Sequence, residues 1–370
     1  MRFFAFGTRS LVSVAVASVA ALVSSNFIAP TATADDKPAL PQMVAYRWGI
    51  SPDGNVAFTK WVGADVVWAE DFEASETWDN IQYPGWQLYP WQKWVEADAR
   101  RRLVLSVPML PGAWNRSGPP KGIAAKQPVS LAAGARGEYN AYYEMLAKKL
   151  VEHKLEKTIL RIGWEMNGGW YVWRASDDVK SWTEYFRQIV KTMRAVPGQQ
   201  FQFVWNPATD YGQFAAETSY PGNEFVDVIG IDVYDQSWGK DTYPIPKDAT
   251  PEETERRQKK AWSDWIWGGN HGLKFWNDFA QKQQKPMAVC EWGVCQRSDG
   301  RGGLDNPYFI EQMHKFITDP ANNVLWHCYF DVEAGDGKHQ LSPGKDGKHQ
   351  TLFPKSAAKF LELFGHKPPN

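Results

Sequence analysis

Short apolar runs alternate with longer amphipathic runs along most of this chain. Eight of the short runs are rich in valine, isoleucine and aromatic residues, as buried strands are: residues 43–50, 64–70, 102–110, 158–165, 201–206, 225–234, 287–293 and 323–330. Strands that alternate with helices predict a parallel sheet, and eight is the number that closes a TIM barrel. The pattern therefore predicts an α/β fold of the (β/α)8 TIM barrel type.

The segments between these runs carry helical spacing. It is clearest over 176–194, where Ser176 can cap a helix and apolar residues recur at intervals of three and four, and residues 136–153 behave similarly. Residues 235–262 are polar and contain two prolines, so we expect a long loop over the barrel mouth there. No linker-like run divides residues 35–370, which are therefore expected to form a single catalytic domain.

The first 34 residues are typical of a secretory signal peptide. Arg2 and Arg9 lie in the short segment before an apolar run over 11–23, and Ala32-Thr33-Ala34 resembles a small-x-small cleavage motif. This run is shorter than the roughly 20 residues that span a bilayer, which disfavours an uncleaved anchor. We therefore expect a secreted or periplasmic protein with no membrane contact after cleavage.

Charge narrows the range of partners. The chain has 41 Lys plus Arg against 42 Asp plus Glu, and such a balanced charge gives no reason to expect binding to nucleic acid or to an anionic membrane.

The sequence contains neither H-E-x-x-H nor C-x-x-C, so the spacing of its potential ligands predicts no metal site. The cysteines, Cys290, Cys295 and Cys328, are too few for a disulfide scaffold, although a bridge between two of them is left open.

Tryptophan is the most unusual feature of the composition, with 20 in the chain. About half are expected in the core, but several lie in segments rich in Gly and Asn that have the composition of loops. These are Trp114, Trp170, Trp173, Trp238, Trp265 and Trp267. Flat apolar rings on loops suit the C–H faces of sugars, and we interpret them as the walls of a carbohydrate cleft.

Glutamates lie at or near the ends of the fourth and seventh expected strands: Glu165 in "RIGWE" and Glu291 in "MAVCEWG". Catalytic groups in a TIM barrel come from the C-terminal ends of its strands. Alternation puts Glu291 on the same face as Met287 and Val289, and if that face is inward both carboxylates rise from the rim. Two carboxyls about 5 Å apart would suit retaining glycoside hydrolysis.

Two residues are candidates to tune these carboxylates. Arg161 shares a face with Glu165, and an ion pair with Asp232 or Asp65 is an equally good interpretation of it. Tyr234 ends the sixth strand, beside the seventh, where its hydroxyl would hold Glu291 charged.

Four segments resemble family 26 glycoside hydrolases, of the clan of (β/α)8 retaining enzymes. They are "RIGWEMNGGWYVW", "GIDVY", "KPMAVCEWG" and "GGLDNPYFIEQMHKFI". The resemblance implies that Glu165 is the acid/base, Glu291 the nucleophile and Tyr234 its supporting tyrosine, and that Trp170 and Trp173 line sugar subsites. The family usually has His before the acid/base, whereas this chain has Trp164. Endo-β-mannanase is the best-known activity of the family, which also contains lichenases and β-1,3-xylanases.

Further polar and aromatic residues near the strand ends are candidate substrate contacts. They are Asn167, Asn206, Trp292 and Trp326, together with Arg47 and Trp48 on the first strand. Alternation does not decide whether Trp292 and Trp326 point inward. His327 is expected to be a core residue and Cys290 to point outward to the helices.

The sequence thus predicts a secreted, monomeric, retaining endo-glycoside hydrolase that acts on a β-linked polysaccharide. β-Mannan, β-glucan, xylan and a bacterial exopolysaccharide all remain open as substrates. The chemistry requires no metal or organic cofactor. The alternatives are an inverting hydrolase that uses the same two carboxylates, and a barrel that binds polysaccharide without cleaving it.

Overall fold

A computed structural model describes residues 40–47, 51–112, 129–209, 214–335, 337–344 and 350–365. The expected signal peptide over 1–34, Trp48 and Trp114 lie outside these residues. Among the described residues, no helix combines the length and the hydropathy of a membrane-spanning segment.

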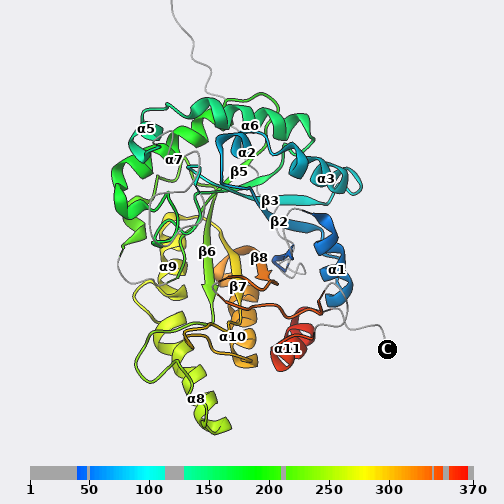
Figure 1. Ribbon diagram of the computed structural model, residues 1–370, viewed down its shortest axis with the longest axis vertical. Helices are drawn as coiled ribbons and strands as arrows, with labels where there is room; N and C mark the ends of the chain where they lie inside the picture. The colour runs from blue at the N-terminus through cyan, green and yellow to red at the C-terminus, as the bar shows by residue number, and fades with distance from the viewer. Residues whose placement is uncertain are drawn as a thin grey trace, which may run out of the picture. The chain divides into compact units, whose positions relative to one another are not determined.

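Eight parallel strands close into one barrel in chain order, which confirms the predicted (β/α)8 fold (Figure 1). Each strand lies within or beside the segment that was predicted for it. They are β1 (Gln42–Tyr46), β2 (Trp68–Phe72), β3 (Arg102–Val107), β4 (Ile159–Ile162), β5 (Gln202–Trp205), β6 (Val228–Tyr234), β7 (Met287–Gly293) and β8 (Val324–Phe330).

Helices surround the strands in Figure 1. They are α1 (Pro52–Val62), α2 (Trp78–Gln82), α3 (Gly85–Glu96), α5 (Leu131–Ala135), α6 (Asn140–Glu152), α7 (Val179–Arg194), α8 (Pro251–Ala261), α9 (Leu273–Gln283), α10 (Pro307–Thr318) and α11 (Pro354–Phe364). Four shorter turns are η1 (Ala175–Asp177), η2 (Ala216–Ser219), the π-helical η3 (Trp262–Trp267) and η4 (Pro320–Asn322).

Two details of the helices differ from the prediction. Asp178 caps α7 by accepting a hydrogen bond from the backbone of Ser181, whereas Ser176 lies in the preceding turn η1. Residues 235–262 are not irregular throughout, because Pro251 and the capping hydroxyl of Thr250 start helix α8. Part of the polar composition of that segment belongs to α8, whose residues are exposed or half-buried except for Gln258 and Ala261.

The core has an outer and an inner layer. The outer layer, between strands and helices, contains Leu160, Ile231 and Trp292, while the inner layer fills the barrel with residues such as Val104 and Trp326. Above this apolar filling, toward the C-terminal ends of the strands, the interior becomes polar. Glu70, Ser106, Arg161, Asn206 and Asp232 are all buried there and joined by hydrogen bonds.

Candidate active site

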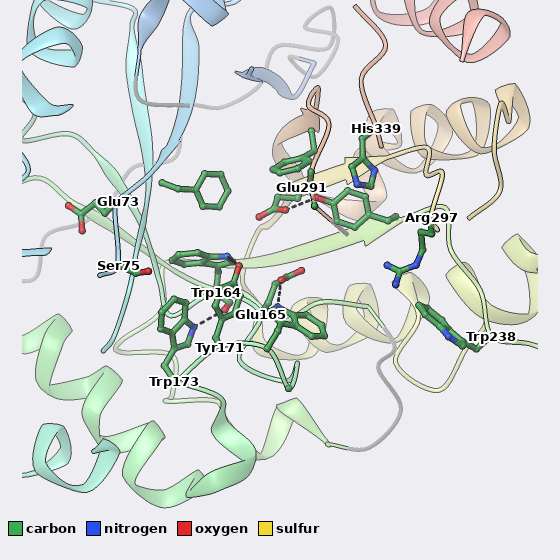
Figure 2. Close-up of a pocket in the computed structure, with 17 residues that line it drawn as sticks. Glu73, Ser75, Trp164, Glu165, Tyr171, Trp173, Trp238, Glu291, Arg297 and His339 are labelled. Carbon is green, nitrogen blue, oxygen red and sulfur yellow. Dashed lines mark hydrogen bonds between the residues drawn. The ribbon is translucent and has the colours of Figure 1, made fainter. Parts of the chain in front are cut away.

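A cavity of about 670 Å³ opens at the C-terminal ends of the strands, and Glu165 and Glu291 both line it. Figure 2 shows these two carboxylates near the middle of the cavity, with Glu73 toward one end and Trp238 toward the other. Glu165 is 9% exposed and Glu291 6%. Carboxylate oxygens of Glu165, Asp232 and Glu291 lie within 4.8 Å of one another. The predicted pair is therefore brought together.

Glu165 reaches the cavity through a left-handed turn and not through the alternation of a strand. β4 ends at Ile162, and both Gly163 and Glu165 have positive φ, 56° and 51°. A side chain at Gly163 would meet the sulfur of Met109 at 2.4 Å. The backbone of Glu165 donates to the carbonyl of Asn206 at 2.7 Å, which holds the strained residue in place.

Glu291 reaches the cavity because strand β7 contains a bulge. Met287 and Val289 belong to the outer layer, so simple alternation would turn Glu291 away from the barrel. The pairing with β6 skips one residue: Ile231 pairs with Val289, and Asp232 pairs with Glu291. The extra residue, Cys290, points into the barrel, and Glu291 next to it faces inward as well. The predicted outward direction of Cys290 is therefore wrong.

Arg161 connects three buried carboxyl groups beneath the cavity. Its Nη2 donates to Asp232 at 2.9 Å and to Glu291 at 2.9 Å, and its Nη1 donates to Glu70. The predicted pairing with Asp232 is thus present, whereas Asp65 pairs with Arg100 at the surface. Burial raises the pKa of Glu70 to about 7, although Arg161 opposes this shift. Burial likewise raises the pKa of Asp232 well above its usual range against the pull of Arg161.

Tyr234 holds Glu291 from the other side. Its hydroxyl donates to Oε2 of Glu291 at 2.6 Å, while Arg161 binds Oε1. Burial, followed by the charge of Glu291, raises the pKa of Tyr234 far above its usual value, so the phenol remains a donor. The donors on its two oxygens fix the orientation of Glu291.

Aromatic side chains surround Glu165. The indole nitrogen of Trp170 donates to Glu165 Oε2 at 2.8 Å. Trp164, Tyr171 and Trp173 form an adjoining wall in which the rings of Tyr171 and Trp173 stack at 4.3 Å. Trp173 is almost fully buried, with its indole nitrogen bonded to the carbonyl of Trp164, so it supports the wall more than it presents a sugar platform.

The other end of the cavity is more polar. Trp238 is 37% exposed, and the Arg297 guanidinium lies 5.4 Å from the centre of its ring. His339 lies beside Tyr234, with a ring separation of 4.6 Å, and its Nδ1 lies 2.8 Å from the carbonyl of Val294. Trp238 was predicted from its loop composition, whereas nothing in the spacing of Arg297 or His339 pointed to them.

Several predicted contacts lie elsewhere. Asn206 is buried below the cavity and accepts from Arg161 Nε at 2.8 Å. Asn167 exchanges two hydrogen bonds with the backbone of Ala208 and so ties the Glu165 loop to the β5 end. Both asparagines support the site and do not line the cavity.

Trp292 and Trp326 are likewise fully buried away from the cavity, so their prediction as substrate contacts is wrong. Trp292 packs outward, where it donates to His327, and this confirms His327 as a core residue. Trp326 fills the bottom of the barrel, where β8 starts. Arg47 pairs with buried Asp331 and is a structural residue.

All three cysteines are buried and no disulfide joins any two of them, so the bridge left open by the sequence does not form. Cys290 and Cys328 lie in the inner layer of the barrel. Burial raises the pKa of both thiols well above the usual range, which makes either one a poor nucleophile.

Sequence analysis missed Glu73, which follows β2 and lines the cavity. It is 4% exposed, and among the residues that the structure describes neither of its carboxyl oxygens has a hydrogen-bond partner. Burial, and to a smaller extent Asp71, raise its pKa well above the usual range. Like Glu165, Glu73 is a glutamate that follows the end of a strand, here β2. No family-like motif surrounds Glu73, so the sequence did not single it out. Other lining residues that the sequence did not single out are Phe72, Ser75, Tyr171 and Phe330.

Glu165, Asp232 and Glu291 also form a grouping of the kind that holds a metal ion. The guanidinium of Arg161 already contacts Asp232 and Glu291 and supplies positive charge to both. The charge of the cluster is thus balanced in part by a side chain of the chain itself, and two of the three groups have their oxygens oriented by that side chain.

Comparison with known proteins agrees with this geometry. The pattern of Glycosyl hydrolase family 26 matches residues 130–246, which include Glu165 and Tyr234. A mannan endo-1,4-beta-mannosidase of Bifidobacterium adolescentis is 23% identical over 195 residues, covering 50% of this chain and 18% of that enzyme. These matches confirm the resemblance to family 26 that the motifs predicted.

Solved structures share the fold. An endo-beta-1,4-mannanase of Cellulomonas fimi superposes with a TM-score of 0.53 at 18% identity, covering 83% of this chain and 65% of that one. The GH26C protein of Muricauda sp. gives a TM-score of 0.55 at 17% identity, with 88% and 85% covered. The chain thus spans less than a fifth of its curated relative and about two thirds of the Cellulomonas fimi chain.

Proposed function

We propose that this chain, with its family 26 match over residues 130–246, is a retaining endo-glycoside hydrolase of a β-linked polysaccharide. The observation that carries the proposal is the pair Glu165 and Glu291, whose nearest oxygens lie within 4.8 Å in an aromatic cavity. β-Mannan is the first candidate substrate, because the Bifidobacterium adolescentis relative is a mannan endo-1,4-beta-mannosidase.

In the first step Glu291 attacks the anomeric carbon while Glu165 gives its proton to the glycosidic oxygen. The carbon–oxygen bond breaks, the shortened chain leaves as an alcohol, and the remaining sugar is esterified to Glu291. In the second step Glu165, now ionised, takes a proton from water, and the hydroxide displaces Glu291 from the sugar. Two inversions at the anomeric carbon give net retention.

The surrounding residues suit these two roles. Tyr234 and Arg161 each donate to one oxygen of Glu291, which holds the carboxyl group in a fixed direction for the attack. Glu165 receives a hydrogen bond from the indole nitrogen of Trp170 at 2.8 Å. The indole fixes the orientation of Glu165 without adding a positive charge that would promote loss of its proton.

The carboxyl separation favours retention over inversion. Retaining enzymes hold their carboxyl groups about 5 to 5.5 Å apart, whereas inverting enzymes leave roughly 6.5 to 9.5 Å for a water molecule. The nearest carboxylate oxygens of Glu165 and Glu291 lie within 4.8 Å of each other, which supports the shorter separation of the retaining enzymes. Direct attack by Glu291 is therefore the preferred mechanism.

Endo action is supported by the two ends of the cavity. Residues Glu73 and Ser75 lie toward one end and Trp238 and Arg297 toward the other, with the catalytic pair between them (Figure 2). A chain bound across the cavity would place sugars on both sides of the bond that is cut. Loops with exposed aromatic rings such as Trp238 suit that mode of binding.

Release of reducing sugar by the full chain tests the proposal. β-Mannan, β-glucans, xylan and bacterial exopolysaccharides are the substrates, and Glu165→Ala and Glu291→Ala are run alongside. We expect wild-type release on at least one polymer and its loss in both variants. Binding of a polymer without release would instead support a non-catalytic barrel, and release that survives Glu291→Ala would overturn the nucleophile.

Export is a separate part of the proposal. It rests on the signal-like composition of residues 1–34, and cleavage after Ala34 would start the mature chain at Asp35. Mass spectrometry of the protein recovered from the producing cells and from their medium tests it. Retention of residues 1–34 in the recovered protein would contradict it.

A further inference from the structure

Two neighbouring side chains of the cavity wall, Trp164 and Tyr171, form a hydrogen bond that the proposed mechanism does not use. The indole nitrogen of Trp164 donates to the hydroxyl of Tyr171 at 2.8 Å. Both residues line the cavity together with Glu165 and Glu291. Figure 2 shows the two rings beside Glu165.

The Tyr171 hydroxyl has a donor in Trp164 but no acceptor among the described residues. A phenol has one proton to give and can accept hydrogen bonds through its oxygen. Because the indole N–H of Trp164 points at the Tyr171 oxygen, the phenol proton must point away from Trp164. The cavity is the space that Tyr171 lines, so the proton is available to a molecule bound there.

Tyr171 stays protonated over the whole working range of a protein. Burial raises its pKa well above the usual value, and the negative charges of Glu165 and Glu291 raise it further. The hydroxyl is therefore a permanent donor beside the two carboxylates.

The position of this hydroxyl is fixed by packing. The Tyr171 ring stacks on Trp173 at 4.3 Å with an angle of 10° between the planes, and Trp164 meets its edge at 5.1 Å. The indole of Trp173 is itself bonded to the carbonyl of Trp164. A donor held this firmly loses little entropy when it binds a ligand.

We propose that Tyr171 is a specificity-determining residue that donates a hydrogen bond to an oxygen of the sugar bound beside Glu165, with Trp164 as the residue that orients it. This inference rests on the proposed function and adds a requirement to it. The sugar at that place must present an acceptor oxygen to Tyr171, since an unmatched polar group in a buried site is costly. Trp164, the residue before Glu165, then affects specificity by orienting Tyr171. It offers no polar atom of its own to the sugar.

A double-mutant cycle tests this pairing. Tyr171→Phe removes only the hydroxyl, Trp164→Phe removes the N–H and keeps an aromatic ring, and the third variant carries both changes. Kinetics are measured on the polysaccharide that the wild type cleaves, with thermal denaturation of every variant. Tyr220→Phe is the matched control, because its hydroxyl bonds to Asn223 and lies outside the cavity.

We expect Tyr171→Phe to lower kcat/KM about tenfold, as the loss of one hydrogen bond does. Trp164→Phe should lower it by less, and the double variant should be no worse than Tyr171→Phe, because Trp164 acts only through the hydroxyl. Tyr220→Phe should leave kcat/KM unchanged. The melting temperatures of Tyr171→Phe and Tyr220→Phe should differ from that of the wild type by similar amounts.

Two results would overturn the inference while leaving the proposed function intact. One is wild-type kcat/KM in Tyr171→Phe, and the other is a double variant whose loss is the product of the two single losses. If the wild type cleaves no polymer, the proposed function fails, and the same cycle is applied to the dissociation constant of a bound β-linked oligosaccharide. Equal constants for wild type and Tyr171→Phe, or no binding at all, would then overturn the inference too.

Discussion

The hydroxyl of Tyr234 donates a 2.6 Å hydrogen bond to Oε2 of Glu291, and the other oxygen of Glu291 receives Arg161 Nη2 at 2.9 Å. One carboxylate is thus held by a neutral donor from β6 and by a cation from β4. The arrangement fixes the direction of the proposed nucleophile.

Tyr234→Phe should lower kcat about tenfold to a hundredfold, because Glu291 loses one of two donors while its ion pair with Arg161 remains. The phenyl ring keeps the contact with His339. Steady-state kinetics on the cleaved polysaccharide measure the effect, and the full rate in Tyr234→Phe would show that the hydroxyl does not support catalysis.

Arg161→Met should destabilise the protein by about 3–5 kcal/mol, since it leaves Glu70, Asp232 and Glu291 without their shared cation. Urea denaturation measures the free energy of unfolding. Arg174→Met is the control: Arg174 pairs with Asp177 at the surface, and its loss should cost no more than about 1 kcal/mol. Equal stabilities of the two variants would contradict the role given to Arg161.

Glu73→Leu should stabilise the protein by about 1–3 kcal/mol, because it removes a buried carboxyl group that has no hydrogen-bond partner in the described part of the chain. Glu76→Leu, three residues further on at the surface, should change stability by less than about 0.5 kcal/mol. Urea denaturation of both variants provides the comparison. A lower stability of Glu73→Leu would mean that this carboxyl is paired in solution.

Glu70→Gln should weaken the dependence of stability on pH. The pKa of Glu70 is about 7 in the folded protein against a usual value of 4.5, because burial disfavours the charge. Between these two values the unfolded chain releases the proton and the folded protein keeps it, so stability falls as the pH rises through this window. Glutamine resembles the protonated form and removes that contribution, at most about 1.4 kcal/mol per pH unit.

Urea denaturation at several pH values across this window checks the Glu70 prediction. Burial also raises the pKa of Asp235, which contributes to wild type and variant alike, whereas the raised pKa of Asp232 depends in part on the charge of Glu70. The difference between the two slopes therefore reports Glu70 together with its effect on Asp232. Parallel slopes would mean that Glu70 ionises normally in the folded protein.

The strands were predictable because parallel strands buried on both faces are continuous apolar runs. The direction in which side chains point near the strand ends was harder to predict. Glu291 faces the cavity only because Cys290 is an extra residue in β7, and Glu165 only because Gly163 and Glu165 adopt left-handed backbone conformations. Neither a bulge nor a positive φ at a glutamate has a signal in hydrophobic spacing.

Only some of the residues that line the cavity were predictable from the sequence, for a similar reason. Trp170 and Trp238 line it, as their loop composition suggested, whereas Trp292 and Trp326 are core residues on strands. Composition separates loop from strand but does not tell which side of a strand a residue occupies near a bulge. Glu73 and Tyr171 enter the cavity from loops whose path depends on tertiary packing.

The stereochemistry of the first product tests the central claim most directly. Proton NMR follows the anomeric signals while the full chain hydrolyses β-mannan, or whichever β-linked polymer it cleaves fastest. Attack by Glu291 followed by water predicts that the β anomer appears first and the α anomer only later, by mutarotation. An α anomer released first would contradict the double displacement and would make Glu291 the base of an inverting enzyme.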